Sequence, residues 1–162
     1  MKYGIMLPSR GELARPDSLS AIAQRAEELG YHVMMFPDHI VLPRNTDSKY
    51  PYSESGNFRG TDTNETMEQL PTLAFLAGQT KTIRLVTSVM IVPHRSPVVT
   101  AKVLSTIDVL SKGRMTVGVG VGWLKEEFEA LQTPPFEERG AITDEYILAF
   151  TALRSEEHTT EL

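Results

Sequence analysis

The sequence predicts an α/β fold in which parallel strands alternate with helices. Short β-rich runs alternate with segments whose apolar residues recur with the 3.6-residue period of a helix. The expected strands begin near residues 3, 31, 83 and 115, so the repeat is about 30 residues except where a long loop intervenes. The 162 residues are about two-thirds of the roughly 250 that a closed (β/α)8 barrel needs. The pattern therefore predicts half of an eight-fold barrel or, alternatively, a small doubly wound sheet.

The first elements are the most regular. A strand is expected over residues 3–7, a helix over 16–29 and a second strand over 31–36. The second strand is apolar at nearly every position, which is typical of strands buried on both faces. Gly30 follows the helix directly, as is common just past a helix end. The helix is supported by one apolar face, made of Leu19, Ile22, Ala23, Ala26 and Leu29.

The middle of the chain departs from this repeat. Residues 37–66 are rich in Pro, Asn, Asp, Ser and Gly, which indicates a functional loop or an insert. A helix is expected over 67–79, where Thr66 and Gln69 have the spacing of a capping box, unless Pro71 moves the start later. The remaining elements are a strand over 83–92, a helix from Pro97 to just before Gly113, a strand over 115–119, and helices at about 124–131 and 138–153.

Composition excludes several classes of protein. Sixteen Lys and Arg against 21 Asp and Glu give a net charge of −5, and no basic run is present, so no nucleic-acid partner is expected. The apolar runs are too short for a membrane span, and the run before Pro8 is too short for a signal peptide, so we expect a cytoplasmic protein. There are no cysteines, and the four histidines lack metal-ligand spacing, so no metal site is expected.

Candidate functional residues follow the expected strands. In both possible architectures, ligands bind at the carboxyl ends of parallel strands. Asp38 and His39 come directly after the second strand, and an imidazole can give or take a proton near neutral pH. A turn-initiating Asp and a histidine that caps a loop are the alternatives. Ser88 and Val89 lie where small polar residues interrupt the third strand.

A glycine-rich segment follows the fourth strand. Gly118, Gly120 and Gly122 allow the backbone to approach a ligand closely, although simple packing is an equal alternative. Trp123 occupies the place of the last glycine of a dinucleotide-binding fingerprint, so a nicotinamide site is not expected. Trp123 itself either flanks the mouth of the site or is a packing residue.

Several blocks of sequence together resemble the bacterial luciferase-like monooxygenase superfamily, and in particular its F420-dependent oxidoreductases. The resemblance covers residues 1–153 and corresponds to the N-terminal half of that family's TIM (β/α)8 barrel, a truncated half barrel of about four βα units. The blocks are Gly30-Tyr31, Phe36-Pro37-Asp38-His39, Thr80 to Leu85, Pro93 to Pro97, Leu110 to Arg114, and Gly118 to Trp123 with Glu126-Glu127-Phe128.

The resemblance implies hydride transfer between the deazaflavin coenzyme F420 and a small organic substrate. It implies that His39 lies beside the coenzyme ring, and that a cis peptide between Ser88 and Val89 supports one face of that ring. Asp38 would hydrogen-bond the coenzyme or orient His39, and the loop containing Gly120, Gly122 and Trp123 would line the edge of the ring. An FMN-dependent monooxygenase on the same scaffold is the alternative.

The end of the chain departs from the family pattern. Residues 154–162 resemble a translated sequencing adapter, so we expect a truncated gene whose last nine residues are not native. A half barrel exposes two open sheet edges, which favour pairing with another copy. We therefore expect a homodimer, and a non-catalytic flavin-binding relative or an inert fragment is a further alternative.

Overall fold

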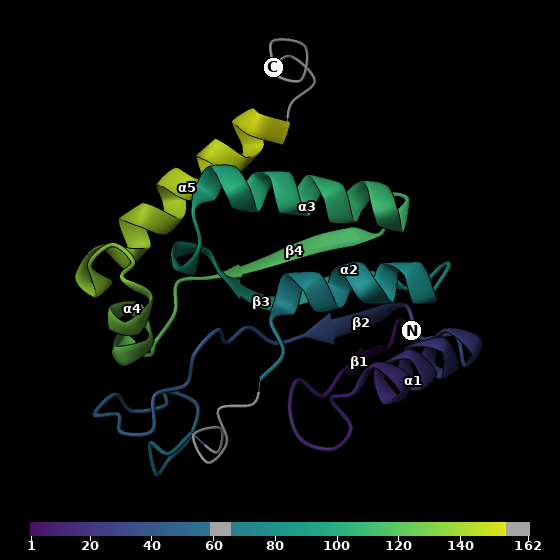
Figure 1. The fold of residues 1–162 in the computed structure, drawn as a ribbon, viewed down its shortest axis with the longest axis horizontal. Coiled ribbons are helices and arrows are strands. Elements are labelled where there is room, and N and C mark those ends of the chain that lie inside the picture. The colour runs from purple at the N-terminus through teal and green to yellow at the C-terminus, as the bar shows by residue number, and fades with distance from the viewer. Residues whose placement is uncertain (59–65, 155–162) are drawn as a thin grey trace. The chain divides into compact units, whose positions relative to one another are not determined.

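A computed structural model describes residues 1–58 and 66–154 of the chain (Figure 1). The chain divides into two compact units, each described here by itself. The sheet unit comprises Met1–His39, Met67–Met90 and Lys102–Val119, and the second unit comprises Ile40–Thr66, Ile91–Ala101 and Gly120–Leu162. Residues 155–162, which include most of the expected non-native tail, lie outside the described residues.

The elements alternate as the sequence predicts. In chain order they are β1 (Gly4–Met6), α1 (Pro16–Glu28), β2 (Val33–Phe36), α2 (Gln69–Gln79), β3 (Arg84–Ile91), the 3-10 helix η1 (Val92–His94), α3 (Pro97–Ser111), β4 (Met115–Gly120), α4 (Lys125–Leu131), the 3-10 helix η2 (Phe136–Glu138) and α5 (Arg139–Arg154). In the part of the chain that the structure describes, no helix is long and apolar enough to cross a membrane.

The strands form one sheet in the order β1-β2-β3-β4. The β1–β2 and β2–β3 pairs are parallel, and Figure 1 shows β4 pointing the same way as β2. Each crossover thus moves one strand further in the same direction. A doubly wound sheet reverses its strand order at a switch point, and this sheet does not. The sequential order confirms the half-barrel prediction and excludes the doubly wound alternative.

One face of the sheet is packed and the other is more open. Met34 of β2 and Leu85 of β3 are paired in register and are fully buried. On the opposite face, Met6 of β1 is exposed, and Met35 and Val86 are only half-buried. Right-handed crossovers that all run in one direction place their helices on the same side of a sheet. The helices therefore cover one face, as they cover the outside of a barrel.

Helix α1 forms where the apolar periodicity predicts it. Leu19, Ala23 and Ala26 are buried. The helix ends in a Schellman motif, because Gly30 donates to the Glu27 carbonyl and Tyr31 donates to the Ala26 carbonyl. Gly30 has a φ of 79°, a conformation that residues with a side chain rarely adopt.

The capping box expected at the start of α2 is wrong. The helix begins at Gln69, and its N-cap is Glu68, whose carboxylate accepts a hydrogen bond of 2.7 Å from the Leu70 amide. Gln69 does not cap the helix. Its side-chain Nε2 donates instead to the carbonyl oxygen of Phe36, at the carboxyl end of β2, over 2.8 Å. A tertiary hydrogen bond has replaced the local one.

Arg114 organises the amino-terminal end of the sheet. Its buried guanidinium makes five hydrogen bonds of 2.7 to 3.1 Å, which matches the five donors that an arginine has. The acceptors are the carbonyl oxygens of Ser111, Ile83, Ala77 and Thr80 and the hydroxyl of Thr80. One side chain thereby links the ends of α2 and α3 to the start of β3.

Glu27 of α1 binds the same end of the sheet from another side. Its carboxylate accepts hydrogen bonds from the backbone amides of Lys81, Thr82 and Ile83, in the turn before β3. Burial alone would raise the pKa of Glu27, but these hydrogen bonds to the charged form lower it from 4.5 to about 2. The α2–β3 turn is therefore held by an ionised carboxylate.

In the second unit, two adjacent glutamates of α4 hold the loop that begins at Ile40. Buried Glu127 accepts hydrogen bonds from the amides of Ile40 at 2.8 Å and Val41 at 3.1 Å. Glu126 accepts from the amides of Asp47 and Ser48. Burial would raise the pKa of Glu126, but its hydrogen bonds to Ser48 and Asp47 lower it to about 2. The loop is thus ordered by carboxylates more than 75 residues away in sequence.

Candidate functional site

The carboxyl ends of the parallel strands lie together in the sheet unit, as the sequence analysis requires. Phe36 at the end of β2 is in register with Thr87 of β3. Thr87 in turn donates from its hydroxyl to the carbonyl oxygen of Gly118 in β4, over 2.8 Å. The residues that follow these three positions therefore belong to one edge of the sheet. Asp38, His39, Ser88 and Val89 are all at this edge.

Asp38 and His39 follow β2 in two different environments. Asp38 is only 4% exposed, so its carboxyl group is held inside the protein. His39 is half-buried, which leaves its imidazole accessible to a ligand. A buried carboxyl beside an accessible imidazole is an arrangement that can position a base and exchange a proton.

The bond between Ser88 and Val89 is a cis peptide, as the family resemblance implies. It lies in β3, one residue beyond the Thr87 that contacts β4. Ser88 is half-buried, and the Val89 side chain is 46% exposed although it belongs to a central strand. An exposed apolar side chain at the ligand-binding edge of a parallel sheet offers a surface on which a flat ring can lie.

Gly118 has a packing role. A Cβ atom at this position would collide with the backbone carbonyl oxygen of Thr87. The absence of a side chain is what allows β4 to approach β3 beside the cis peptide. Of the two alternatives for this glycine, close packing is the one that the contacts support.

Sequence reasoning missed Gln69 as a member of this edge. Its side chain is fully buried, and its Nε2 binds Phe36, two residues before Asp38. Because a carbonyl oxygen can only accept, this bond assigns the amide orientation and leaves Oε1 as an acceptor. Oε1 has no hydrogen-bond partner among the described residues. A buried acceptor without a partner commonly marks the place of a water or ligand.

Gly120, Gly122 and Trp123 belong to the second unit. Gly122 has a φ of 84°, and a Cβ there would lie 2.7 Å from the Phe128 ring, so a glycine is required by both conformation and packing. Trp123 packs against Tyr50 and Phe58, with ring centroids 5.1 and 5.4 Å apart. Trp123 is therefore part of an aromatic cluster. Gly120 is the last residue of β4.

His94 and Glu127 form a buried pair in the second unit. Nδ1 of His94 lies 4.0 Å from Oε1 of Glu127, and both side chains are almost completely buried. The His94 ring also packs edge-on against Phe128, with centroids 4.7 Å apart. Local sequence places Glu127 in the first turn of a helix, where acids are common, so only the fold shows that it is buried. No group of three metal-ligating side chains is present in residues 1–58 and 66–154.

The fold and this edge define an α/β protein with half of a parallel barrel and a candidate ligand site at the carboxyl ends of its strands. The chain belongs to the luciferase-like monooxygenase family, whose model matches residues 1–161.

Relatives of this chain include proteins of known and unknown activity. An uncharacterized protein of Mycobacterium tuberculosis is 30% identical over 157 residues, which is 97% of this chain and 54% of that protein. An F420-dependent glucose-6-phosphate dehydrogenase of Amycolatopsis mediterranei is 30% identical over 129 residues, covering 78% of this chain and 34% of the enzyme. The chain thus spans about half the length, or less, of the curated relatives it matches.

Solved structures of the same architecture support the half-barrel assignment. The monooxygenase RslO1 of Streptomyces bottropensis has a TM-score of 0.70 and 27% identity, covering 96% of this chain and 44% of the enzyme. An F420-dependent secondary alcohol dehydrogenase in complex with an F420-acetone adduct has a TM-score of 0.68 and 21% identity, covering 96% and 43%. A type II Baeyer-Villiger monooxygenase of Pseudomonas putida in complex with FMN has a TM-score of 0.66 and 18% identity, covering 93% and 38%. The last two likenesses concern the fold alone.

Proposed function

We propose that this chain is the coenzyme-facing half of an oxidoreductase that transfers a hydride between the deazaflavin coenzyme F420 and a small organic substrate. The observation on which the proposal rests is the edge of the sheet unit where Asp38, His39, Ser88 and Val89 occur together. The dehydrogenase relative of Amycolatopsis, named as F420-dependent, supports this choice of coenzyme. No nucleic acid or membrane partner is proposed.

The residues at this edge fit a flat heterocycle with a polar rim. The exposed Val89 side chain provides an apolar surface for one face of the ring, and Ser88 lies beside it. Oε1 of Gln69, which has no hydrogen-bond partner among the described residues, provides a buried acceptor for an N–H group. When bound, a deazaflavin supplies a site that accepts or donates a hydride.

The chain's own part of the chemistry is proton transfer. A substrate hydroxyl whose carbon loses a hydride must also lose its O–H proton, and the accessible imidazole of His39 accepts that proton as a general base. In the reverse direction His39 returns it. Buried Asp38 orients His39 or hydrogen-bonds the coenzyme, and a fixed neighbour of this kind keeps an imidazole in the productive orientation.

An FMN-dependent monooxygenase is the second candidate. It is favoured by the 27% identity to a monooxygenase of known structure. F420 lacks the ring nitrogen by which FMN supports oxygen activation, so the two coenzymes support different reactions. The same edge of the sheet would serve either ring, and a non-catalytic flavin-binding relative would use it without turnover.

The test is a titration of the chain with F420 and, separately, with FMN, followed by coenzyme fluorescence. We expect saturable binding of F420, weakened because the phosphate-binding units of a barrel usually follow its seventh and eighth strands. Tighter binding of FMN supports the second candidate and rejects the first, and absence of binding to both coenzymes rejects both.

His39→Ala tests the site itself, with His32→Ala as the matched control. His32 lies at the opposite end of β2 and is exposed. The His39 variant is expected to bind F420 at least about 10-fold more weakly, which corresponds to about 1.4 kcal/mol. The His32 variant is expected to bind like the unaltered chain. Equal binding by all three proteins would remove His39 from the site.

A further inference from the structure

Glu127 of α4 is a completely buried acid that the proposed chemistry does not use. Its Oε1 accepts hydrogen bonds from the backbone amides of Ile40 at 2.8 Å and Val41 at 3.1 Å. Burial of an acid is costly, and hydrogen bonds from amides offset part of that cost. A buried carboxyl group that binds two consecutive amides is suited to fixing a segment of backbone.

The carboxyl group of Glu127 is itself held in place. His94 of η1 lies beside it, with Nδ1 4.0 Å from the same Oε1, and the His94 side chain is also almost completely buried. The His94 ring packs edge-on against Phe128, the next residue of α4. Because close-packed buried groups have few alternative positions, Oε1 is a fixed point for the amides that it binds.

The Ile40 amide belongs to the peptide group that follows His39. Its nitrogen is bonded to the carbonyl carbon of His39, and a peptide group is planar, so a hydrogen bond to this N–H fixes the plane of the group. The orientation of that plane sets the backbone angle ψ of His39. Glu127 therefore restrains His39 through a covalent bond, and its hydrogen bonds to Ile40 and Val41 lie within the second unit.

The short segment that contains His39 is also anchored at its other end. Within the sheet unit, the carbonyl oxygen of Phe36 accepts a hydrogen bond of 2.8 Å from Nε2 of Gln69. Between the two anchored peptide groups lie Pro37, Asp38 and His39. The ring of Pro37 fixes its φ, and the Asp38 side chain is buried, so the segment has little conformational freedom.

We propose that Glu127 is a positioning residue for His39, which it keeps in one orientation by holding the peptide between His39 and Ile40. This inference rests on the proposed function, in which the imidazole of His39 accepts the substrate proton. Proton transfer requires hydrogen-bond geometry, so a base on a flexible backbone is productive for only part of the time. In this proposal Glu127 contacts neither substrate nor coenzyme and acts through His39 alone.

The first measurement needs no coenzyme. The order parameter of the His39 backbone N–H, obtained from NMR relaxation, is expected to be about 0.85 in the unaltered chain and to fall below about 0.6 in Glu127→Met. Glu127→Gln keeps an acceptor oxygen and is expected to retain the higher value. Glu126→Met is the matched control, because Glu126 binds the amides of Asp47 and Ser48 and its loss should leave His39 ordered.

A milder variant covers the case in which circular dichroism shows that Glu127→Met is unfolded. Glu127→Asp keeps the carboxyl group but withdraws it by one methylene, so the bonds of 2.8 and 3.1 Å can no longer both form. The order parameter of His39 is expected to fall in this variant too.

The second measurement is a fluorescence titration with F420. Glu127→Met and His39→Ala are each expected to weaken binding about 10-fold. The double variant is expected to bind no more weakly than His39→Ala, because Glu127 acts through a side chain that has already been removed. A general structural role of Glu127 would instead make the two losses multiply.

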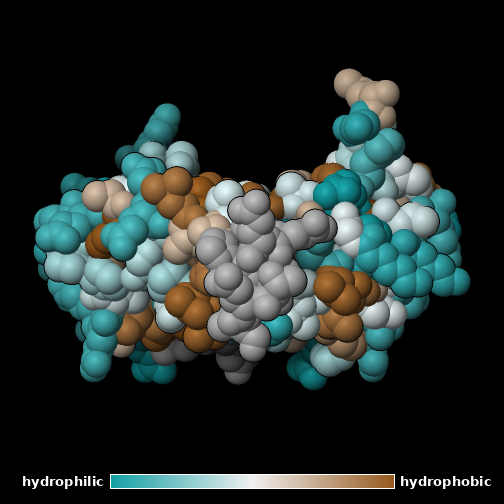
Figure 2. All heavy atoms as spheres, turned by 90° about the horizontal axis from the view of Figure 1, so that it is seen from above, coloured by the Kyte–Doolittle hydropathy of each residue, from teal (hydrophilic) through white to brown (hydrophobic). Residues whose placement is uncertain are grey.

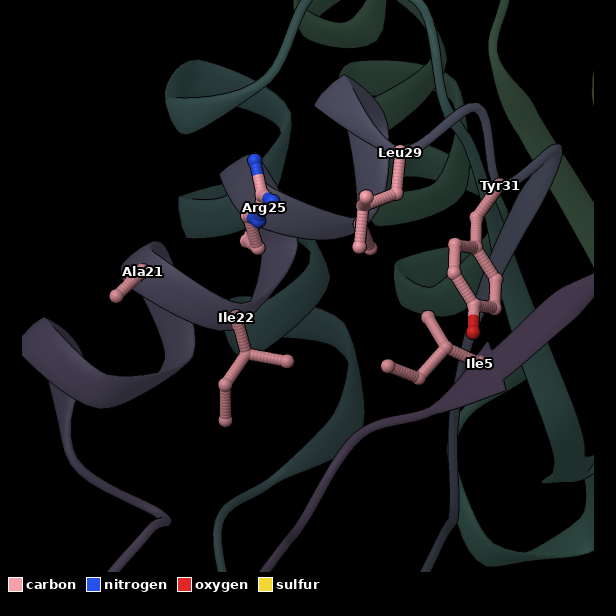
Figure 3. A pocket seen from close by; sticks show the side chains of 7 residues that line it. Ile5, Ala21, Ile22, Arg25, Leu29 and Tyr31 are labelled. Atoms are coloured by element: carbon pink, nitrogen blue, oxygen red, sulfur yellow. The ribbon is translucent and has the colours of Figure 1, made fainter.

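Apolar surface elsewhere on the chain calls for a control for non-specific binding of the coenzyme ring. Figure 2 shows apolar side chains as separate patches among hydrophilic ones. Figure 3 shows an apolar groove of 430 Å³ between α1 and β1, where Ile22 and Ile5 point towards one another with Leu29 and Tyr31 close by. Tyr31 precedes β2, whereas His39 follows it. The Leu29 side chain is 59% exposed, and Leu29→Lys should leave F420 binding unchanged.

Four results would overturn the proposal. The first is a His39 order parameter that stays near 0.85 in a folded Glu127→Met or Glu127→Asp variant. The second is an equal loss of His39 order in Glu126→Met. The third is a pair of binding losses that multiply in the double variant, and the fourth is weaker binding in Leu29→Lys, which would place the ring in the groove.

Failure of the proposed function would look different. If the unaltered chain bound no F420, the coenzyme assignment would be rejected, and the order parameters alone would decide whether Glu127 holds His39 in place.

Discussion

The two ends of the parallel sheet satisfy their polar groups in opposite ways. At the amino-terminal end, Arg114 uses all five of its donors on groups of the protein, and Glu27 binds three consecutive amides. At the carboxyl end, Gln69 is equally buried but keeps an acceptor without a partner among the described residues. Among the described residues, the donors of Arg114 at the first end are all used within the protein, whereas one buried acceptor at the second end is left over for a water or a ligand.

This difference separates residues that maintain the fold from residues that serve a ligand. In barrels of parallel strands, the amino-terminal face contributes stability and the carboxyl face contributes chemistry. Two of the blocks that resemble the family, Thr80 to Leu85 and Leu110 to Arg114, meet at the amino-terminal face. Their resemblance therefore reflects a shared scaffold, and it says little about the substrate.

The largest effect is expected at the amino-terminal end. Arg114→Met leaves several buried carbonyl oxygens without donors, and each such group costs about 1–3 kcal/mol. Urea denaturation followed by circular dichroism should show that the free energy of unfolding falls by at least about 3 kcal/mol. Arg84→Met is the control, because Arg84 is exposed and its loss should cost at most about 1 kcal/mol. If the two variants lost the same free energy of unfolding, the hydrogen bonds of Arg114 would not be what stabilises this end of the sheet.

Next in size is Gly118→Ala, near the carboxyl end of β4. The added methyl group collides with the Thr87 carbonyl oxygen, and overpacking of this kind costs about 1–3 kcal/mol. Gly78→Ala in α2 is the control. Nothing lies within 4 Å of a Cβ at Gly78, so alanine there should raise stability by about 0.5–1 kcal/mol. If both alanine substitutions changed the free energy of unfolding in the same direction, close packing at Gly118 would be disproved.

Gln69→Met is expected to change binding more than stability. It removes the hydrogen bond to Phe36, but it also removes a buried acceptor that has no partner among the residues the structure describes. The free energy of unfolding should therefore change by no more than about 1 kcal/mol. Binding of F420 should weaken about 10-fold in fluorescence titration. Gln24→Met removes a surface hydrogen bond of 3.2 Å to the Gln79 carbonyl and should leave binding unaltered. Unaltered binding in the Gln69 variant would exclude Gln69 from the site.

The smallest effect is expected for Glu27→Gln, and it should depend on pH. The pKa of Glu27 is lowered in the folded chain, so the ionised form stabilises the fold above the ordinary value of 4.5. That stability is lost as the pH falls towards about 2. The difference in unfolding free energy between the unaltered chain and the variant should therefore be greatest near pH 7 and shrink below pH 4.5. Gln24→Met, which removes a surface hydrogen bond and no ionisable group, should show no such trend.

The regular part of the fold could be predicted because its determinants are local. The apolar stripe of α1 and Gly30 beyond it lie within one short window of sequence, and Pro97 begins α3 as expected. The roughly 30-residue repeat predicts a sequential strand order if the chain is part of a barrel. The edge containing Asp38, His39, Ser88 and Val89 followed in turn from the parallel direction of the strands.

The rest depends on partners that are distant in sequence. Gln69 has the spacing of a capping residue, and only the fold brings the Phe36 carbonyl, 33 residues away, within its reach. Glu127 looks like an ordinary acid at a helix start, yet it binds amides 86 and 87 residues away. Only the fold shows that a side chain at Gly122 would collide with the Phe128 ring, six residues further along the chain.

The aromatic cluster around Trp123 gives the protein a built-in optical probe. Trp123 is the only tryptophan in the 162 residues, and the rings of Tyr50 and Phe58 lie against it. The emission wavelength of Trp123 therefore reports whether the segment from Ile40 to Phe58 is packed against it. The circular dichroism of the helices, in contrast, is averaged over the whole chain. Comparing the two spectra during denaturation will show whether that segment detaches before the sheet unfolds.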